Sequence, residues 1–408
     1  MTTPHHPTDF LHDLRTRSAA EGGVFWINDD LLAVFDPDAA RRVSGANWQG
    51  LLMSDRFVDM LRRRRSTQIP WARVRTEWRT QLHTLATAEH HANLITRMER
   101  AIDARLGDDI DLVLLAQDAA VRALLPVALA GLTGRESAWI VQDLDQKLMR
   151  LIDRPPGTGP RHQLHFAAVQ FRAGLVVRRV LRERAAGRRV RECDLADPFV
   201  DLLPELGMDR ALDVVTAVLT AIAGPPGAAA ASVLYELARQ PRWARRLTVE
   251  LGDADPDDFH ASPVKAAPLT HRFVKEVLRM WSPPLLLMRE ARTSFDVGST
   301  TLEEGRGYVL SPHMIHRDPR FWRDADVFDP DRFLPGAPHG PVGRGCYVPF
   351  GWAPKKCVGA DIGTVQLMAL CYLMCTRYRL VVPAAEQVTM AYRFAPVPQS
   401  FKGELTLR

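Results

Sequence analysis

The feature of this chain that most constrains its fold is a long apolar stretch, Asp209 to Gln240, with two consecutive prolines near its middle. Apolar residues at three- and four-residue spacing predict a buried central helix here. The two prolines between Gly224 and Gly227 carry no backbone N–H and clash with the preceding helical turn. We therefore expect a kink at Gly224–Gly227, where the carbonyls of Ala221 and Ile222 lose their helical donors.

The rest of the chain divides into helical and strand-like parts. Between about residues 85 and 250 the apolar periodicity is mostly helical, with one amphipathic helix over Leu82 to Leu106 and another over Asp118 to Leu132. Later in the chain, short apolar runs separated by turn residues predict small strands. These runs are Leu285–Met288, Ser294–Val297 and Tyr308–Leu310, and the chain from Gln387 onward has the pattern of a terminal hairpin.

The fold class that follows is mainly α with small β-sheets (α+β). We expect a single domain over residues 1–408. Its helix-rich core should cover about 70–282 and 312–380, and its β-rich parts about 20–50, 285–310 and 385–408.

Composition and charge exclude several classes of protein. The 408 residues are 46% hydrophobic and 25% charged, as is usual for a folded soluble chain. The 53 Lys and Arg against 48 Asp and Glu leave a net charge of only +5, with both signs interleaved, so we expect no nucleic-acid partner. Five cysteines are an odd number and too sparse for a disulfide scaffold. With no signal-peptide pattern and no apolar run long enough for a membrane anchor, we expect a cytoplasmic protein.

One loop carries the strongest chemical signal. The segment Pro349 to Ala360 combines Gly, Pro and aromatic residues around one cysteine, Cys357, and an apolar helix over Asp361 to Tyr378 follows at once. A thiolate near a helix N-terminus is stabilised by the helix dipole, and neighbouring glycines let a flat ligand approach closely. These features suit an axial thiolate ligand of haem iron. A buried cysteine in a turn is the alternative interpretation.

This segment resembles the cysteine-ligand loop of the cytochrome P-450 family, Phe-Gly-x-Gly-x-(His/Arg)-x-Cys-x-Gly. Four positions match: Phe350, Gly351, Cys357 and Gly359. Ala353 stands where the second Gly is usual, and Lys355 stands where His or Arg usually reaches a haem propionate. The resemblance implies the P-450 fold and haem b (iron protoporphyrin IX), with Cys357 as the axial ligand of the iron.

Further motifs match the family in order and spacing, so that the resemblance covers the chain from about residue 20 to its end. Glu276 and Arg279 match the Glu-x-x-Arg of its K helix, and Pro330–Phe333 resembles its Pro-Glu-Arg-Phe segment. The resemblance implies that Arg332 pairs with Glu276 and Arg279 and fixes the loop behind the haem. Three residues match propionate-binding positions of the family: Trp71, Arg75 and Arg289.

The central helix departs from the family pattern Ala-Gly-x-(Asp/Glu)-Thr. Ala223 and Gly224 match, but the acid position holds Pro226 and the alcohol position holds Gly227. In the family the acid and the alcohol relay protons to iron-bound dioxygen, and neither Pro nor Gly has a side chain that can do so. Thr220, one turn earlier, is a candidate substitute. The alternative is that its hydroxyl bonds to its own helix backbone.

The resemblance also indicates which segments face a substrate. They are the loop Leu51 to Ile69 and the pocket residues Ala221, Ile222, Leu285, Leu286, Leu287 and Pro396. These segments are mainly apolar, which favours a small lipophilic substrate. The resemblance to a soluble chain of this type implies a tailoring enzyme of bacterial secondary metabolism.

Three functions from different classes stay open. The first is a haem-thiolate monooxygenase or oxidase with a non-standard proton relay. It would be reduced by a ferredoxin or flavodoxin and an NAD(P)H-dependent reductase, with Lys355 and Lys356 in the docking patch. The second is a peroxide-driven or redox-neutral haem enzyme: a peroxygenase, isomerase or dehydratase. The third is a catalytically silent haem- or ligand-binding module.

Overall fold

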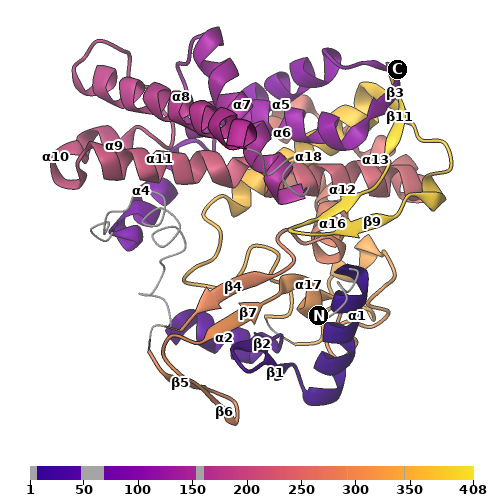
Figure 1. The fold of residues 1–408 in the computed structure, drawn as a ribbon. Helices are drawn as coiled ribbons and strands as arrows, with labels where there is room; N and C mark the ends of the chain where they lie inside the picture. The colour runs from indigo at the N-terminus through magenta and orange to yellow at the C-terminus, as the bar shows by residue number, and fades with distance from the viewer. Residues whose placement is uncertain (1–6, 47–68, 153–159, 292, 344) are drawn as a thin grey trace. The chain divides into compact units, whose positions relative to one another are not determined.

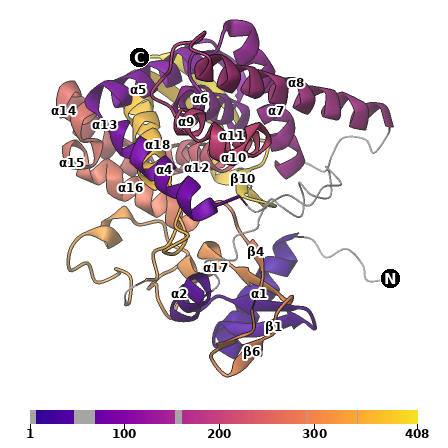
Figure 2. The ribbon, with the colours of Figure 1, turned by 90° about the vertical axis from the view of Figure 1, so that its left-hand side faces the viewer.

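The computed structural model describes residues 7–46, 69–152, 160–291, 293–343 and 345–408. The chain forms two compact units, each assembled from segments far apart in the sequence. The first, which we call the sheet unit, comprises Met1–Trp71, Arg272–Ala360 and Met390–Pro396. The second, the helical unit, comprises Ala72–His271, Asp361–Thr389 and Val397–Arg408. Figures 1 and 2 label helices and strands of both units.

The sheet unit is built on a four-stranded sheet of order β1-β2-β7-β4. Its strands are β1 (Val24–Asn28), β2 (Leu31–Val34), β4 (Leu287–Glu290) and β7 (Gly307–Leu310), and β5 (Phe295–Val297) pairs with β6 (Thr300–Leu302) in a separate ribbon. β2 and β7 run parallel, and the other pairs are antiparallel. Its helical elements are α1 (Pro7–Glu21), α2 (Pro37–Ala46), most of α16 (Pro268–Met280), α17 (Pro312–His316) and the 3₁₀ turn η2 (Pro330–Phe333).

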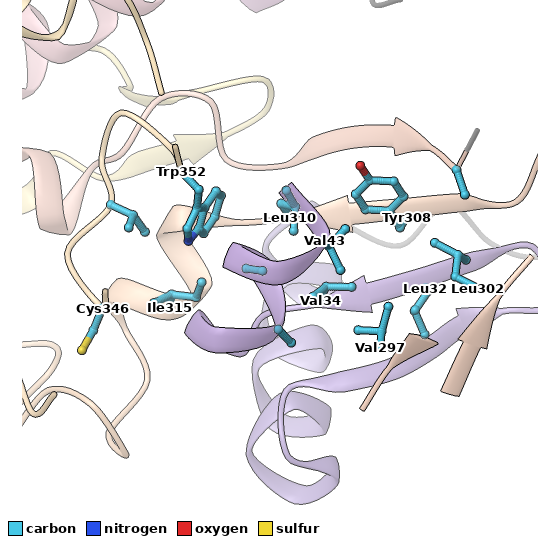
Figure 3. Packing of buried hydrophobic residues seen from close by; sticks show 14 of the residues in the cluster. Leu32, Val34, Val43, Val297, Leu302, Tyr308, Leu310, Ile315, Cys346 and Trp352 are labelled. Carbon is cyan, nitrogen blue, oxygen red and sulfur yellow. The ribbon is translucent and has the colours of Figure 1, made fainter. Parts of the chain in front are cut away.

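The core of the sheet unit lies between the sheet and the segments that cover it. Buried side chains from β2 and β7 pack there with Val43 of α2 and with Trp352, which lies five residues before Cys357 (Figure 3). Burying such apolar surface contributes roughly 25 cal/mol per Å². The segment that carries Cys357 is therefore anchored by the same core as the sheet.

The helical unit contains most of the helices. They are α4 (Trp71–Thr84), α5 (Ala88–Asp103), α6 (Leu112–Ala128), α7 (Gly134–Ile152), α8 (Pro160–Ala185), α9 (Pro198–Asp201), α10 (Leu203–Leu206), α11 (Met208–Ala223), α12 (Pro225–Arg239), α13 (Pro241–Asp253), α14 (Pro256–Ala261), α15 (Pro263–Ala266) and α18 (Ala360–Thr376). A small sheet of order β3-β11-β8 completes the unit: β3 (Gly107–Asp111), β8 (Tyr378–Val381) and β11 (Lys402–Leu407). The remaining elements near the C-terminus are η3 (Ala385–Gln387) of this unit, β9 (Met390–Tyr392) of the sheet unit, and β10 (Pro396–Pro398), where the chain passes from the sheet unit to the helical unit.

The central helix is interrupted where the prolines predict. α11 ends at Ala223, Gly224 takes a non-helical conformation, and α12 begins at Pro225 with proline in its first turn. α6 lies against both helices (Figures 1 and 2). The stretch Met208–Arg239 is long and apolar enough to cross a membrane, but 61% of its most apolar window is buried inside the structure, as in a core helix. The kink at Gly224–Gly227 and the mainly α fold with small sheets are confirmed.

Two expected helices have wrong boundaries. The helix expected over Leu82–Leu106 is two helices, because Thr87 accepts a bond from the His90 backbone N–H and caps a new helix, α5. The helix expected from Asp118 begins six residues earlier, because Asp111 accepts from the N–H groups of Val113 and Leu114 and caps α6. The single domain over 1–408 stays a prediction, and most of the loop Leu51 to Ile69 lies outside the described residues.

Candidate functional site

The loop before α18 holds Cys357 at the surface of the sheet unit. The N–H of Cys357 donates to the Phe350 carbonyl at 2.8 Å, and the N–H of Gly351 donates to the Val348 carbonyl at 2.9 Å. Gly351 has φ +77°, a left-handed conformation that favours glycine, so this matching position has a backbone reason. Cys357 is exposed, three residues before α18 begins. The loop thus presents a thiol at a helix N-terminus.

A buried histidine supports the strand of chain that leads into this loop. The N–H of Val348 donates to Nε2 of His316 at 2.8 Å, and Nδ1 of His316 lies 2.9 Å from Oγ of Ser282. Oγ of Ser282 donates to the Leu278 carbonyl at 2.5 Å, so it accepts from Nδ1–H of His316. The imidazole is therefore neutral. Complete burial, with a smaller effect of the nearby Arg279 charge, lowers the pKa of His316 to about 3.

We expect this histidine to make the protein sensitive to mild acid. An unfolded His titrates near 6.5, so the unfolded state binds one more proton than the folded state between about pH 3 and 6.5. The free energy of unfolding should therefore fall by up to about 1.4 kcal/mol for each pH unit below 6.5. When the free energy of unfolding is measured with urea across this pH range, it should change less steeply with pH in His316→Asn than in the wild type. The exposed His12→Asn is the control, and an equal slope in both variants and in the wild type would contradict the assignment.

The three charged residues expected to form a lock lie together, fully buried, in the sheet unit. Nε of Arg279 donates to Oε2 of Glu276 at 2.8 Å, and Nε of Arg332 donates to Oε1 of Glu276 at 3.0 Å. Each of the three is at most 1% exposed. The carboxylate of Glu276 also accepts from the Asp329 N–H at 2.8 Å, so both of its oxygens are satisfied.

Most of the remaining guanidinium N–H groups of the lock donate to backbone carbonyls, and Nη2 of Arg279 also donates to Sδ of Met280. Arg279 donates to the carbonyls of His316, Ala325 and Val327. Arg332 donates to the carbonyls of Arg323, Asp324, Val327 and His339. Charge-assisted bonds of this kind are the strong ones in proteins. The network ties α16 to the long loop that precedes Cys357.

Arg289, a further residue of the sheet unit, suits a ligand that carries carboxylates. Arg289 is half-buried on β4, and burial lowers the pKa of its guanidinium. It forms no ion pair with any residue that the structure describes, and its Nη1 donates to the neighbouring Met288 carbonyl. A desolvated cation without a carboxylate partner matches a haem propionate. An exposed thiol at a helix N-terminus and this cation together fit the donor set that haem needs.

Three residues expected near the haem, and the neighbouring Lys356, have less distinctive settings. Trp71 and Arg75 are half-buried and lie one turn apart at the start of α4. Lys355 is half-buried and Lys356 is exposed in the loop before Cys357. Their contacts with haem propionates or a redox partner stay predictions.

In the helical unit, the candidates on the central helix have specific surroundings. The hydroxyl of Thr220 donates to the Thr216 carbonyl at 2.8 Å, which is the alternative that the sequence left open. The Ala223 carbonyl accepts a bond from Nε2 of Gln117, a residue that the sequence patterns did not single out. The sequence signal for Gln117 is a single polar residue on an otherwise apolar helix. It was missed because the helix was expected to begin only at Asp118, one residue later.

The expected substrate residues differ in exposure. Ala221 is exposed and Ile222 half-buried, whereas Leu285 and Pro396 are buried. Leu286 and Leu287 are half-buried against the core clusters of the sheet unit. Their contact with a substrate stays a prediction.

Two further cysteines, Cys371 and Cys375, are buried in α18. Burial raises the pKa of Cys371 well above its usual value and that of Cys375 to about 11. No group of three or more His, Cys, Asp or Glu residues able to hold a metal ion occurs among the residues that the structure describes. Cys371 and Cys375 therefore pack as core residues of α18.

Comparison with known proteins gives one family. The family model described as "Cytochrome P450" matches residues 143–401, more than half of the chain. Similar curated proteins include a sterol 14alpha-demethylase of Mycolicibacterium vanbaalenii, 30% identical over 222 residues that cover 51% of this chain and 49% of that protein. A pentalenene oxygenase of Streptomyces avermitilis is 29% identical over 43% of this chain and 39% of its own length. The cyclooctatin synthase of Streptomyces melanosporofaciens is 33% identical over 27% of this chain and 24% of its own length.

Solved structures give the same fold over the whole chain. A zebrafish cytochrome P-450 solved with progesterone superposes with a TM-score of 0.77, at 16% identity and 100% coverage of both chains. A cytochrome P-450 haem domain superposes with a TM-score of 0.76, at 18% identity over 98% of this chain and 92% of that one. In sequence, the matched segments span about half or less of the length of the three curated relatives.

Proposed function

Because this chain belongs to the cytochrome P-450 family, we propose that it is a haem-thiolate oxidoreductase that oxidises a small lipophilic molecule. The observation that carries the proposal is the exposed Cys357 just before α18, together with the buried lock of Glu276, Arg279 and Arg332 that holds the preceding loop. The cofactor we propose is haem b. When bound, it would supply the oxidative chemistry that protein side chains lack.

The chain's own residues would hold this group and shape its surroundings. Cys357 would ligate the iron, with Phe350 and Gly359 beside the ring. Arg289, Trp71, Arg75 and Lys355 would bind the propionates, because cations and indole N–H groups pair with carboxylates. The lock and His316 would keep the Cys357 loop in one conformation. Such preorganisation fixes the ligand without reorganisation during the reaction.

The substrate and partners follow from the same proposal. The curated relatives include a sterol demethylase and a pentalenene oxygenase, which supports a lipophilic substrate in bacterial secondary metabolism. Electrons would come from NAD(P)H through a reductase and a ferredoxin or flavodoxin, docking near Lys355 and Lys356 by charge complementarity. We propose a cytoplasmic location.

One observation favours a second candidate, a peroxide-driven or redox-neutral enzyme such as a peroxygenase, isomerase or dehydratase. The acid and alcohol positions of the central helix hold Pro226 and Gly227, and the hydroxyl of Thr220 is engaged by its own helix. A proton relay to dioxygen then has no side chain in these positions. A third candidate, a silent haem-binding module, predicts no turnover under any condition.

Turnover under three regimes separates these candidates. The holoprotein is incubated with a metabolite extract from a strain that lacks this protein, which serves as the source of substrate. The three conditions are NADPH with ferredoxin and its reductase, hydrogen peroxide alone, and no added electron donor or peroxide. We expect conversion in the NADPH regime, with oxygen from isotopically labelled dioxygen in the product or in water. Conversion by labelled peroxide alone would support a peroxygenase. Conversion with neither would support a redox-neutral enzyme, and no conversion would refute the proposed function.

A further inference from the structure

Gln117 lies in the interior of the helical unit, at the break of the central helix. It is 3% exposed and is the one polar residue among the buried residues described in α6. Its Nε2 donates a hydrogen bond to the carbonyl of Ala223, the last residue of α11. A buried amide of this kind is stabilising only while its hydrogen bonds are satisfied. The contact therefore joins α6 to the break itself.

Gly227 gives Gln117 its space. A Cβ atom at Gly227 would lie 2.5 Å from Cδ and 2.9 Å from Cα of Gln117. Carbon atoms in contact are normally about 3.5–4.0 Å apart, so no side chain fits there beside Gln117. One obstructing atom belongs to the backbone of α6. The glycine at the alcohol position of the family motif is thus required by the close approach of α6.

We infer that Gln117 is a positioning residue that takes the place of the missing alcohol side chain and fixes the break of the central helix. By occupying the Ala223 carbonyl, it leaves the carbonyls of Ala221 and Ile222 as the acceptors at the break. These two receive no helical bond, because the residues four positions later are prolines.

The open carbonyls define a class of substrate. Ala221 is exposed and Ile222 is half-buried, so a donor can reach this part of α11. The ligand that fits is a lipophilic molecule with a hydroxyl or amino group that donates to these carbonyls. This substrate class rests on the proposed function, whereas the role of Gln117 in the helix break does not.

Two substitutions of Gln117 separate hydrogen bonding from space filling. Gln117→Met keeps a similar volume but has no donor, so we expect faster hydrogen–deuterium exchange across residues 216–232 than in the wild type. Gln117→Glu can donate only while its carboxyl is protonated, and burial raises the pKa of such a group. At low pH, Gln117→Glu should therefore exchange as slowly as the wild type, and at high pH as fast as Gln117→Met, with all proteins compared at the same pH. Wild-type exchange in the Met variant at every pH would overturn the role.

A double variant tests the steric half of the inference. Gly227→Ala should lower Tm by several degrees, and adding Gln117→Ala should recover part of that loss because two obstructing atoms leave. Gly252→Ala is the matched control, since a Cβ atom added to this glycine of α13 would have nothing within 4 Å. It should not lower Tm. Additive effects of the two substitutions would overturn the steric coupling.

A binding measurement tests the substrate class. We compare dissociation constants of ferric holoprotein for a terpene alcohol and for its parent hydrocarbon. The wild type should prefer the alcohol several-fold, and Gln117→Met should lose most of that preference, which a purely structural role would not cause. Binding of neither probe would refute the lipophilic substrate of the proposed function, while the exchange experiment still decides the role of Gln117. An unchanged preference in Gln117→Met would overturn the link to substrate.

Discussion

Replacing Cys357 by serine is expected to abolish the long-wavelength absorption of the ferrous carbonyl complex, which is the signature of thiolate ligation. Cys357 is the exposed cysteine of the sheet unit, and its N–H bond to the Phe350 carbonyl does not depend on the sulfur. The serine variant should therefore keep the loop and lose the ligand. Serine oxygen is a poor replacement for the soft thiolate that we propose as the ligand of the haem iron.

Cys193→Ser is the matched control, because Cys193 is the other exposed cysteine among the described residues. Its Sγ accepts a bond from Nε2 of Gln81 at 3.3 Å, a contact that serine can replace. This variant should retain the wild-type spectrum. A Cys357→Ser protein with an unaltered carbonyl spectrum would mean that another residue ligates the iron, and the proposed function would fall with it.

Replacing Glu276 by alanine should prevent stable holoprotein from forming. The substitution leaves two buried guanidinium groups, on Arg279 and Arg332, without their carboxylate. Breaking a buried pair by removing one partner costs about 3–5 kcal/mol. That is a large part of the stability of a typical domain, about 5–15 kcal/mol. The yield of haem-replete protein and the urea midpoint should both fall sharply, and Arg279→Ala should behave alike.

A surface carboxylate provides the control for this experiment. Glu205 pairs with Arg73, and both side chains are about half exposed. Exposed pairs contribute about 0–1 kcal/mol, so Glu205→Ala should leave yield and midpoint almost unchanged. Wild-type yields of haem-replete Glu276→Ala and Arg279→Ala would show that the lock does not maintain the fold.

Sequence patterns predicted the structure well where a residue type restricts the backbone strongly, as proline does. The two prolines fixed the break after Ala223, and the mainly α fold followed from the periodicity and the family resemblance. The family resemblance implied that Arg332 joins Glu276 and Arg279, and in the structure both arginines bind the Glu276 carboxylate.

The rest depends on contacts between segments distant in sequence. Thr87 and Asp111 cap helices inside stretches whose apolar periodicity continues, so periodicity alone gave the wrong boundaries. His316 and Gln117 bond to residues 32 and 106 positions away, and only the folded chain brings these partners together. A lone buried polar residue on an apolar helix is the nearest sequence signal for such contacts.

The buried arginines also determine which parts of the sequence can vary. Besides their bonds to Glu276, the two arginines, Arg279 and Arg332, bind the segment 316–339 through the carbonyl oxygens of its backbone. Every amino acid supplies the same carbonyl, so exposed positions such as Arg323 and Val327 can accept different side chains as long as the backbone keeps its path. The arginines cannot vary in this way, because lysine lacks the planar fork of donors. In evolution or in a mutational library, we therefore expect the exposed positions of this loop to diversify, whereas the two arginines and buried residues such as Trp322 should be retained.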